Sequence, residues 1–288
     1  MAIAASSAGR VQREFSLSDP QFEQVRKLIY DHAGISLSAN KREMVYSRLA
    51  RRLRQRGMDT FEDYLQLLER DDAGEWEEFT NALTTNLTAF FREQHHFPLL
   101  ADHVAKQGTA RRILLWCSAA STGEEPYSMA MTMVDLFGSF DPPVRILATD
   151  VDTNVLATAE RGVYADERVE RLSADQKKRF FQRGAGANAG TVRVREELRR
   201  MISFRRLNLL DDVYPIRGPF DAIFCRNVMI YFDKPTQYAI LKKFVPLVRA
   251  EGLLFAGHSE SFYHAADLFK PRGKTVYELA DRRQARHG

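Results

Sequence analysis

The sequence predicts an all-α domain followed by a Rossmann-like α/β domain with a parallel sheet. Three observations support this prediction. Apolar residues recur at helical spacing from about residue 18 to residue 87, with no strand pattern between them. From residue 111 onward, short apolar segments alternate with helical ones. The first of these segments, 112–116, runs into a turn of small residues and then into a helix, an arrangement typical of a ligand-binding sheet edge.

The N-terminal helices have recognisable starts and stops. Ser18 and Pro20 form a helix start, and Gly34 is placed to cap the end of that helix. The second helix ends at Gly57, and its apolar stripe consists of Val45, Leu49 and Leu53. The expected helices span residues 18–33, 39–56, 60–68 and 75–83.

The second half of the chain supplies the strands and one irregular segment. A glycine-rich loop at 183–190 is followed by residues 191–195, which alternate with period two as a hairpin strand does. We therefore expect a small β insertion over about 170–206. The expected strands are 112–116, 144–149, 220–225, 252–256 and, as a last edge strand, 274–279. The predicted domains are a disordered lead-in (1–15), a helical domain (16–85) and the α/β domain (86–288).

Composition narrows the class of protein. The chain has 288 residues, 44% of them hydrophobic and 28% charged, which is typical of a globular protein of one or two domains. The formal charge of +4 does not by itself indicate nucleic-acid binding. Cys117 and Cys225 both end apolar segments, which favours buried thiols in a reducing compartment. No run of about 18 apolar residues predicts a membrane span, and no apolar signal core precedes the helices. We therefore expect a cytoplasmic protein.

The turn at 117–127 is the most informative segment. It has one glycine, Gly123, and two carboxylates, Glu124 and Glu125, and it lacks the G-x-G-x-x-G spacing that binds a pyrophosphate. Carboxylates repel a phosphate but suit a cationic, hydroxyl-rich ligand. S-adenosylmethionine, with a sulfonium, an ammonium and a ribose diol, is such a ligand. We assign Glu124 to the helix dipole and Glu125 to the ligand.

An acidic residue also ends the second predicted strand. Asp150 stands where dinucleotide-binding folds hold a ribose diol. The alternative is that Asp150 caps the next helix, 154–159. The preceding turn favours the ligand role.

Three motifs occur in order along the chain, at residues 86–92 (NLTAFFR), 121–128 (STGEEPYS) and 224–232 (FCRNVMIYF). Together they resemble the bacterial chemotaxis receptor methyltransferase family, CheR, over about residues 17–279. The resemblance implies an all-α domain followed by a class I methyltransferase domain. It also implies an S-adenosyl-L-methionine-dependent protein-glutamate O-methyltransferase that acts on cytoplasmic helices of methyl-accepting chemotaxis receptors and releases S-adenosyl-L-homocysteine.

The resemblance assigns site residues by position. Cofactor contacts are implied for Asn86, Thr88, Arg92, Glu125, Asp150, Asn208, Leu209, Arg226 and Asn227. Arg226 and Tyr231 are implied beside the transferred methyl. Because a strong ion pair would lower the reactivity of a substrate carboxylate, we expect Tyr231 nearest the reacting centre and Arg226 in an orienting role.

Some of these residues also have simpler interpretations. Arg92 is either a surface arginine or a two-hydrogen-bond ligand of the methionine carboxylate. Asn208 is alternatively a turn residue, and Tyr231 a core aromatic residue.

Two segments are candidates for substrate docking. Arg48, Arg51 and Arg54 point away from the apolar stripe of the second helix, as either a solvated face or a docking face for acidic receptor helices. The insertion resembles the family's β subdomain, which in some members binds the receptor C-terminal peptide. Its strand 192–195 is expected at a sheet edge, where it would accept an extended peptide. The implied peptide contacts are Gly184, Gly186, Arg193 and Arg195.

Other function classes are disfavoured. A methyltransferase for nucleic acid or a small molecule lacks support, because no Asn-Pro-Pro-Tyr tetrad is present. Intact Arg92, Glu125 and Asp150 argue against a non-catalytic scaffold. The histidines lack the spacing of a metal site, so no metal is expected. We expect chemoreceptors as partners, no nucleic acid, no membrane insertion and a monomer.

Overall fold

The computed structural model describes residues 14–70, 73–108 and 111–281, which form two compact units. The helical unit contains the chain up to Asp31 and Leu37–Leu83, and the α/β unit contains His32–Ser36 and the chain from Thr84 onward. Residues 1–13 of the expected lead-in lie outside the described residues. Within the described ranges, every helix is too short or too polar to cross a membrane.

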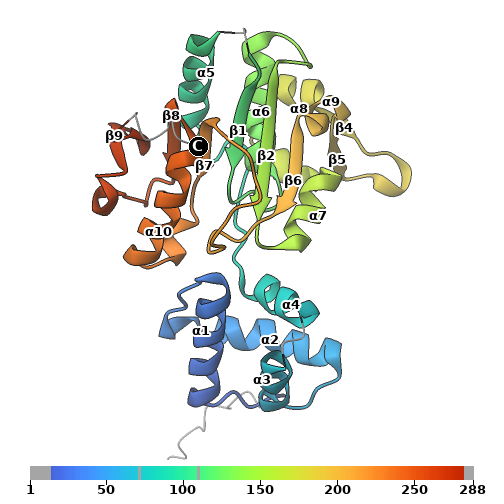
Figure 1. Cartoon of the computed structure of the whole chain (residues 1–288). Helices are drawn as coiled ribbons and strands as arrows, with labels where there is room; N and C mark the ends of the chain where they lie inside the picture. The colour runs from blue at the N-terminus through green and yellow to red at the C-terminus, as the bar shows by residue number, and fades with distance from the viewer. Residues whose placement is uncertain (1–13, 71–72, 109–110, 282–288) are drawn as a thin grey trace, which may run out of the picture. The chain divides into compact units, whose positions relative to one another are not determined.

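The helical unit follows the predicted pattern closely (Figure 1). Gly57 ends α2 with a left-handed backbone at φ 63°, and the Thr60 side chain caps α3 by accepting a hydrogen bond from the Asp63 N–H. Val45, Leu49 and Leu53 are fully buried, as their spacing predicts. The elements are α1 (Asp19–Ala33), η1 (Ala39–Lys41), α2 (Arg42–Arg56), α3 (Phe61–Glu69) and α4 (Ala73–Leu83).

A buried ion pair joins the helices of this unit. Arg52 on α2 donates two hydrogen bonds to Glu75 on α4, at 3.0 and 2.7 Å, and the Glu75 side chain is only 1% exposed. The Tyr64 hydroxyl donates to the same carboxylate at 2.7 Å, and burial raises the pKa of Tyr64. Part of the basic run on α2 is therefore internal to the fold.

The α/β unit is built on a sheet whose order, in the described residues, is β6-β2-β1-β7-β8-β10-β9. The first five strands in this order are parallel, and β10 and β9 are added antiparallel. The strand order reverses between β1 and β7, which makes their carboxyl ends the topological switch point. The strands are β1 (Ile113–Cys117), β2 (Val144–Asp150), β6 (Ile202–Arg206), β7 (Phe220–Cys225), β8 (Val248–Ala256), β9 (Phe269–Gly273) and β10 (Val276–Leu279).

Three strands of this sheet differ from the sequence prediction. β6 lies at one edge with its charged end exposed, so it lacks a continuous apolar run. β9 contains Pro271 and lies at the other edge, where a residue without an N–H is tolerated. The expected edge strand 274–279 corresponds to β10 and is not an edge, because β9 pairs beyond it.

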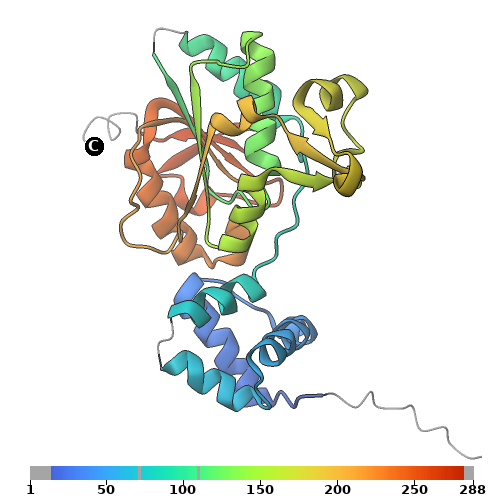
Figure 2. The same ribbon diagram turned by 90° about the vertical axis from the view of Figure 1, so that its right-hand side faces the viewer.

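Helices cover both faces of the sheet (Figures 1 and 2). Alternate residues of β1 face opposite sides: Leu115 belongs to the core under α5 and α6, and Trp116 to the core under α10. The buried thiols Cys117 and Cys225 lie on these two sides respectively. The helices are α5 (His96–Gln107), α6 (Glu124–Phe137), α7 (Thr153–Arg161) and α10 (Lys234–Phe244).

The insertion forms a separate small sheet with strand order β3-β5-β4. It starts at Val163 instead of about 170, and residues 202–206 belong to the large sheet. The expectation that strand 192–195 is an edge is wrong: Arg193 pairs with Val163 on one side and with Gln182 on the other. The insertion consists of β3 (Val163–Ala165), η2 (Asp166–Val169), α8 (Ala174–Phe180), β4 (Phe181–Arg183), η3 (Gly186–Asn188), β5 (Thr191–Val194) and α9 (Glu196–Arg200).

Candidate functional site

The turn after β1 is held between two neighbouring strand ends. The Ser118 N–H donates to the Phe224 carbonyl on β7, and the Ala120 N–H donates to the Thr149 carbonyl on β2, both at 2.9 Å. The turn then enters α6 through Gly123, which has φ 100°. A Cβ on Gly123 would lie 2.8 Å from the Tyr164 hydroxyl, so only glycine fits both the backbone angle and the space.

Glu124, assigned to the helix dipole, has a more specific role. Its side chain is fully buried and forms an ion pair with Arg168, whose Nε donates at 3.1 Å. The Thr122 hydroxyl donates to its second oxygen at 2.6 Å. Glu124 therefore joins the start of α6 to the start of the insertion.

Asp150 lies at the carboxyl end of β2, 9% exposed. Its two oxygens accept the Ser121 N–H at 2.8 Å and the Asp152 N–H at 3.0 Å. Burial raises the pKa of Asp150 to about 6, against the opposing effect of these backbone hydrogen bonds. The cap of α7 is Asp152, which accepts hydrogen bonds from the Asn154 and Val155 N–H groups. The alternative of Asp150 as a helix cap is therefore wrong. Its oxygens retain lone pairs for further hydrogen bonds.

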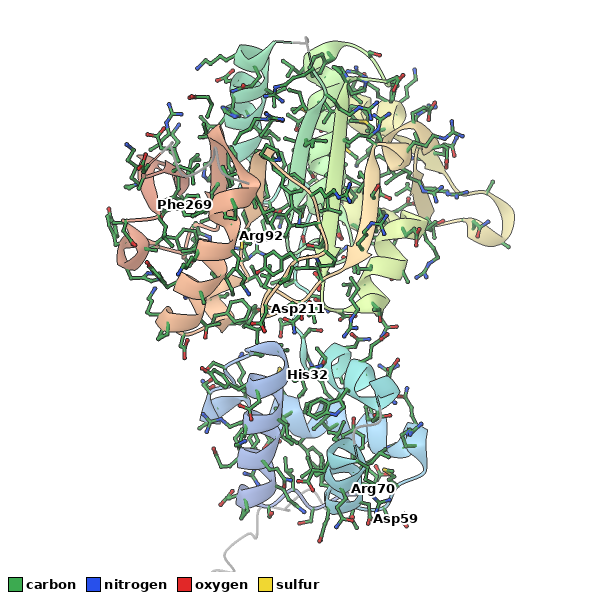
Figure 3. All side chains as sticks on the ribbon, viewed as in Figure 1. His32, Asp59, Arg70, Arg92, Asp211 and Phe269 are labelled. Atoms are coloured by element: carbon green, nitrogen blue, oxygen red, sulfur yellow. The ribbon has the colours of Figure 1, made fainter. Side chains whose placement is uncertain are left out.

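Hydrogen bonds hold the segment 84–92 against the carboxyl end of β2. The Thr84 hydroxyl and the Asn86 amide both donate to Asp152, at 2.7 and 2.8 Å. The Thr88 carbonyl accepts a hydrogen bond from Arg168 at 3.3 Å. Arg92 is half-buried, donates one hydrogen bond to the Leu87 carbonyl at 2.8 Å, and is labelled among the side chains of the α/β unit in Figure 3.

Arg226, at the end of β7, is buried among acceptors. Its side chain is 0% exposed; it donates to Glu125 at 2.7 Å and to the Arg92 carbonyl at 2.6 Å, and it lies 3.2 Å from Glu93. Burial raises the pKa of Glu125, and the Arg226 charge opposes the shift. The Cys117 thiol donates to the other Glu125 oxygen at 3.2 Å. Arg226 is thus the centre of an internal network.

Glu93 was missed by the sequence analysis, although it directly follows the 86–92 motif. Its carboxylate accepts hydrogen bonds from the Asn227 amide at 3.1 Å and from the His258 N–H at 3.1 Å, and its other His258 contact is to the ring Nδ1 at 2.9 Å. Burial tends to raise its pKa, but these hydrogen bonds and the Arg226 charge outweigh burial and lower the pKa of Glu93 to about 2.

Glu260, also missed, shapes the loop that follows β7. Its buried carboxylate accepts the N–H groups of Asn227 at 2.9 Å, Met229 at 2.8 Å and Gly257. Burial raises the pKa of Glu260, and these hydrogen bonds oppose the increase. The sequence has no signal for this residue, because its partners are backbone N–H groups, two of them in the loop after β7.

Strained backbone concentrates at the same edge. Non-glycine residues with positive φ here are Phe91 (51°), Glu93 (52°), Ser121 (48°) and Asn227 (58°). Such conformations cost free energy and persist where surrounding contacts hold them, most often at functional sites. The hydrogen bonds that Glu93, Asp150 and Glu260 accept are among those contacts.

The remaining predicted residues are placed as follows. Asn208 donates to the His32 carbonyl and accepts the Leu210 N–H, both at 3.0 Å, so it forms a turn beside the end of β6. Leu209 is buried in the core under α10. Tyr231 is half-buried, and its hydroxyl has no hydrogen-bond partner among the residues that the structure describes.

The docking candidates on α2 differ from one another. Arg48 donates to the Ala82 carbonyl at 3.2 Å, and Arg54 pairs with Glu14 at 2.7 Å. Arg51 is exposed.

In the insertion, the Gly184 Cα lies against the Asn188 carbonyl, which leaves no room for a Cβ, and Gly186 has φ 58°. Arg195 donates to the Lys178 carbonyl at 3.4 Å, and Arg193 is exposed. A cavity of about 680 Å³ lies beside β4 and is lined by residues other than these four: Asp166, Val169, Glu170, Ala174, Lys177, Lys178, Phe181, Arg183 and Val192.

Family models account for almost the whole described chain. Residues 20–84 match the "CheR methyltransferase, all-alpha domain", and residues 86–278 match the "CheR methyltransferase, SAM binding domain". The chain belongs to the CheR methyltransferase family. It is 56% identical over 269 residues to chemotaxis protein methyltransferase 2 of Pseudomonas aeruginosa, which covers 93% of this chain and 96% of that protein. It is 53% identical over 272 residues to the chemotaxis protein methyltransferase of Escherichia coli, with 94% of each chain covered.

Membership confirms the predicted family, the fold class and S-adenosylmethionine as cofactor. This CheR protein is therefore a chemotaxis protein methyltransferase. The residues at its switch point fit the cofactor. Glu93 and Glu125 pair with Arg226, whereas Asp150 accepts hydrogen bonds from the Ser121 and Asp152 N–H groups and from no cationic side chain of the described residues, so its carboxylate suits a ligand with hydroxyl or ammonium donors and no phosphate.

Proposed function

We propose that this protein transfers a methyl group to glutamate carboxylates on the cytoplasmic helices of chemoreceptors, forming methyl esters. The observation that carries the proposal is the engagement of Arg226 by Glu125, Glu93 and the Arg92 carbonyl. Because both Nη groups of this buried guanidinium already donate within the protein, they do not hold a substrate carboxylate at the end of β7 in an ion pair that would lower its nucleophilicity. A hydroxyl or amine nucleophile would also need a base, whereas a glutamate, with a pKa near 4.3, is already ionised.

The cofactor residues take separate roles in this proposal. Asp150 accepts hydrogen bonds from the ribose hydroxyls, and the unused donors of Arg92 hold the methionine carboxylate. The Asn86 amide donates to Asp152, the Thr88 carbonyl accepts from Arg168, and Arg226 donates to Glu125, so these contacts fix the walls of the site. Asn208 and Leu209 line the end of β6 beside Asp150, with Leu207 donating its N–H to the Asp150 carbonyl at 3.0 Å.

Methyl transfer then depends on alignment. When bound, S-adenosylmethionine supplies a methyl group that passes in line from sulfur to a carboxylate oxygen, with no proton transferred. Holding the two reactants in line supplies up to roughly 7–11 kcal/mol of barrier reduction. The Tyr231 hydroxyl is the group we assign to orient the receptor carboxylate, because no residue in the described part of the chain forms a hydrogen bond with it. Arg226 becomes a residue of the supporting network.

The reaction class is tested with labelled S-adenosylmethionine and receptor-containing membranes. Label on receptor-sized bands that is released by mild base is the expected result, since methyl esters hydrolyse in base. Base-stable label, or label on added RNA or DNA, would instead favour an N-methyltransferase or a nucleic-acid substrate.

Receptor docking is proposed at two places. On α2, Arg51 offers an exposed charge, and Arg48 and Arg54 flank it along the helix. On the insertion, a receptor C-terminal peptide would pair with β4, which is an edge of the small sheet, instead of with the central β5. The cavity beside β4 would take its side chains, with Lys177, Lys178 and Arg183 facing acidic ones. Because the proposed substrates are cytoplasmic helices of the receptors, we infer that the protein acts in the cytoplasm.

A further inference from the structure

The Glu93 carboxylate accepts hydrogen bonds from two loops that are distant from it in sequence. Oε1 accepts the Asn227 amide at 3.1 Å and contacts the His258 ring at 2.9 Å. Oε2 accepts the His258 N–H at 3.1 Å and lies 3.2 Å from Arg226 Nη2. Only a carboxylate can serve all of these donors, because a glutamine would offer one acceptor oxygen and would turn its NH₂ group toward another donor.

These contacts fix the orientation of the Asn227 side-chain amide. Its Nδ2 donates a hydrogen bond to Glu93, and its backbone N–H donates one to Glu260 at 2.9 Å. Gly257 packs so closely that a Cβ there would lie 2.9 Å from the Asn227 nitrogen. The Asn227 amide therefore cannot flip without loss of a hydrogen bond, and its acceptor, Oδ1, is held away from Glu93.

We propose that Glu93 is a positioning residue for the cofactor, which fixes the Asn227 amide so that Oδ1 accepts a hydrogen bond from a hydroxyl or ammonium group of S-adenosylmethionine. The inference rests on the proposed placement of the cofactor beside residues 92 and 226–227. Glu93 acts through Asn227 and does not touch the cofactor itself. The depressed pKa of Glu93 agrees with this role, since the acceptor stays ionised throughout the pH range of the cell.

An exchange of the two side chains tests the proposal. Glu93→Gln and Asn227→Asp each break the donor–acceptor match, whereas the double variant restores one hydrogen bond with its direction reversed and keeps the total charge. We expect each single variant to bind S-adenosylmethionine about tenfold more weakly by calorimetry, the order expected for loss of one hydrogen bond to a charged group. The double variant should bind more tightly than either single variant.

Controls separate positioning from folding. Glu197→Gln, at an exposed position on α9, makes the same chemical change and should leave affinity unaltered. Glu93→Asp keeps both oxygens and suits a left-handed backbone better than Glu does, so it should recover most of the affinity. Thermal melting of each variant reports the fold. If Glu93→Gln does not fold, Asn227→Asp and the double variant still decide the question.

Two results would overturn the proposal: unchanged affinity in a folded Glu93→Gln variant, or a double variant that binds no better than Asn227→Asp. Calorimetry requires no receptor. Unchanged cofactor affinity in these variants would therefore not contradict glutamate methylation. Likewise, absence of receptor methylation would not contradict the role of Glu93 in cofactor binding.

Discussion

The Arg226 guanidinium donates to Glu125 across 2.7 Å, with the Arg226 side chain fully buried. This contact ties the end of β7 to the first turn of α6 across the switch point of the sheet. Both residues belong to segments predicted to face the cofactor, yet here they face each other. The walls of the site are therefore set before any ligand enters.

Removal of one partner of this pair should destabilise the fold. Arg226→Met leaves Glu125 buried beside Glu93 without its cation, and we expect a loss of about 3–5 kcal/mol in unfolding free energy. Urea denaturation of the purified variant measures this loss. A loss below about 1 kcal/mol would mean that the pair contributes little.

Asp150 and Asp152 should separate binding from stability, although they lie two residues apart. Asp150→Ala should weaken S-adenosylmethionine binding at least about tenfold in a protein that still folds, because charge-assisted hydrogen bonds are lost. Asp152→Ala should instead lower stability by about 1 kcal/mol or more, because it removes the cap of α7 and the anchor of Thr84 and Asn86. Calorimetry paired with melting distinguishes them, and equal affinity in Asp150→Ala would end this assignment.

Cofactor binding should weaken in mild acid. The pKa of Asp150 is raised to about 6, so its carboxylate is ionised above that pH and protonated below it. Because protonation removes acceptor capacity, affinity should fall about tenfold for each pH unit below 6. Calorimetry between pH 5 and pH 8 measures this, and Asp150→Asn should abolish the dependence. A flat profile in the unmodified protein would contradict it.

The same shift has a consequence for stability, with the opposite sign. The folded state binds the Asp150 proton more tightly than the unfolded state, whose pKa is near 3.8, so this group makes the protein less stable as pH rises from about 4 to 6. Melting of Asp150→Asn relative to the unmodified protein should show a difference that grows over this range.

The basic face of α2 should affect receptor methylation alone. Arg51→Ala should slow methylation and reduce its dependence on salt, while cofactor affinity stays constant. Arg54→Ala is the matched comparison, because Arg54 already pairs with Glu14, and its effect should be smaller. Equal rates for Arg51→Ala and the unmodified protein at low salt would show that this face is only solvated.

Peptide docking should follow the revised sheet order. Arg183 lines the cavity beside the edge strand β4. The Arg183→Glu variant should therefore bind an extended receptor C-terminal peptide more weakly than the unmodified protein does. Arg193→Glu is the control on the central strand β5. Titration of labelled peptides by fluorescence anisotropy would show which strand matters, and a loss confined to Arg193→Glu would contradict pairing at β4.

The sequence predicts the helices of the first unit, the inner strands of the large sheet and the turn after β1, because each depends on local periodicity and on the chain's own turn residues. It does not predict β6 or β9, because both lie at edges of the sheet and most of their residues are exposed, so they lack an apolar pattern. It also places Arg226 beside the substrate without showing its partners. Those partners, like the donors to Glu93 and Glu260, come from segments brought together only by the tertiary fold; Glu93 and Asn227 are 134 residues apart.

The chemical identity of the product is the most direct test of receptor-glutamate methylation by this protein. Receptor incubated with this protein and S-adenosylmethionine should, by mass spectrometry of its peptides, carry methyl groups on glutamate side chains, and Asp150→Ala should greatly reduce them. Methyl groups found only on lysine or arginine, or a receptor left unmodified while another macromolecule is methylated, would contradict it.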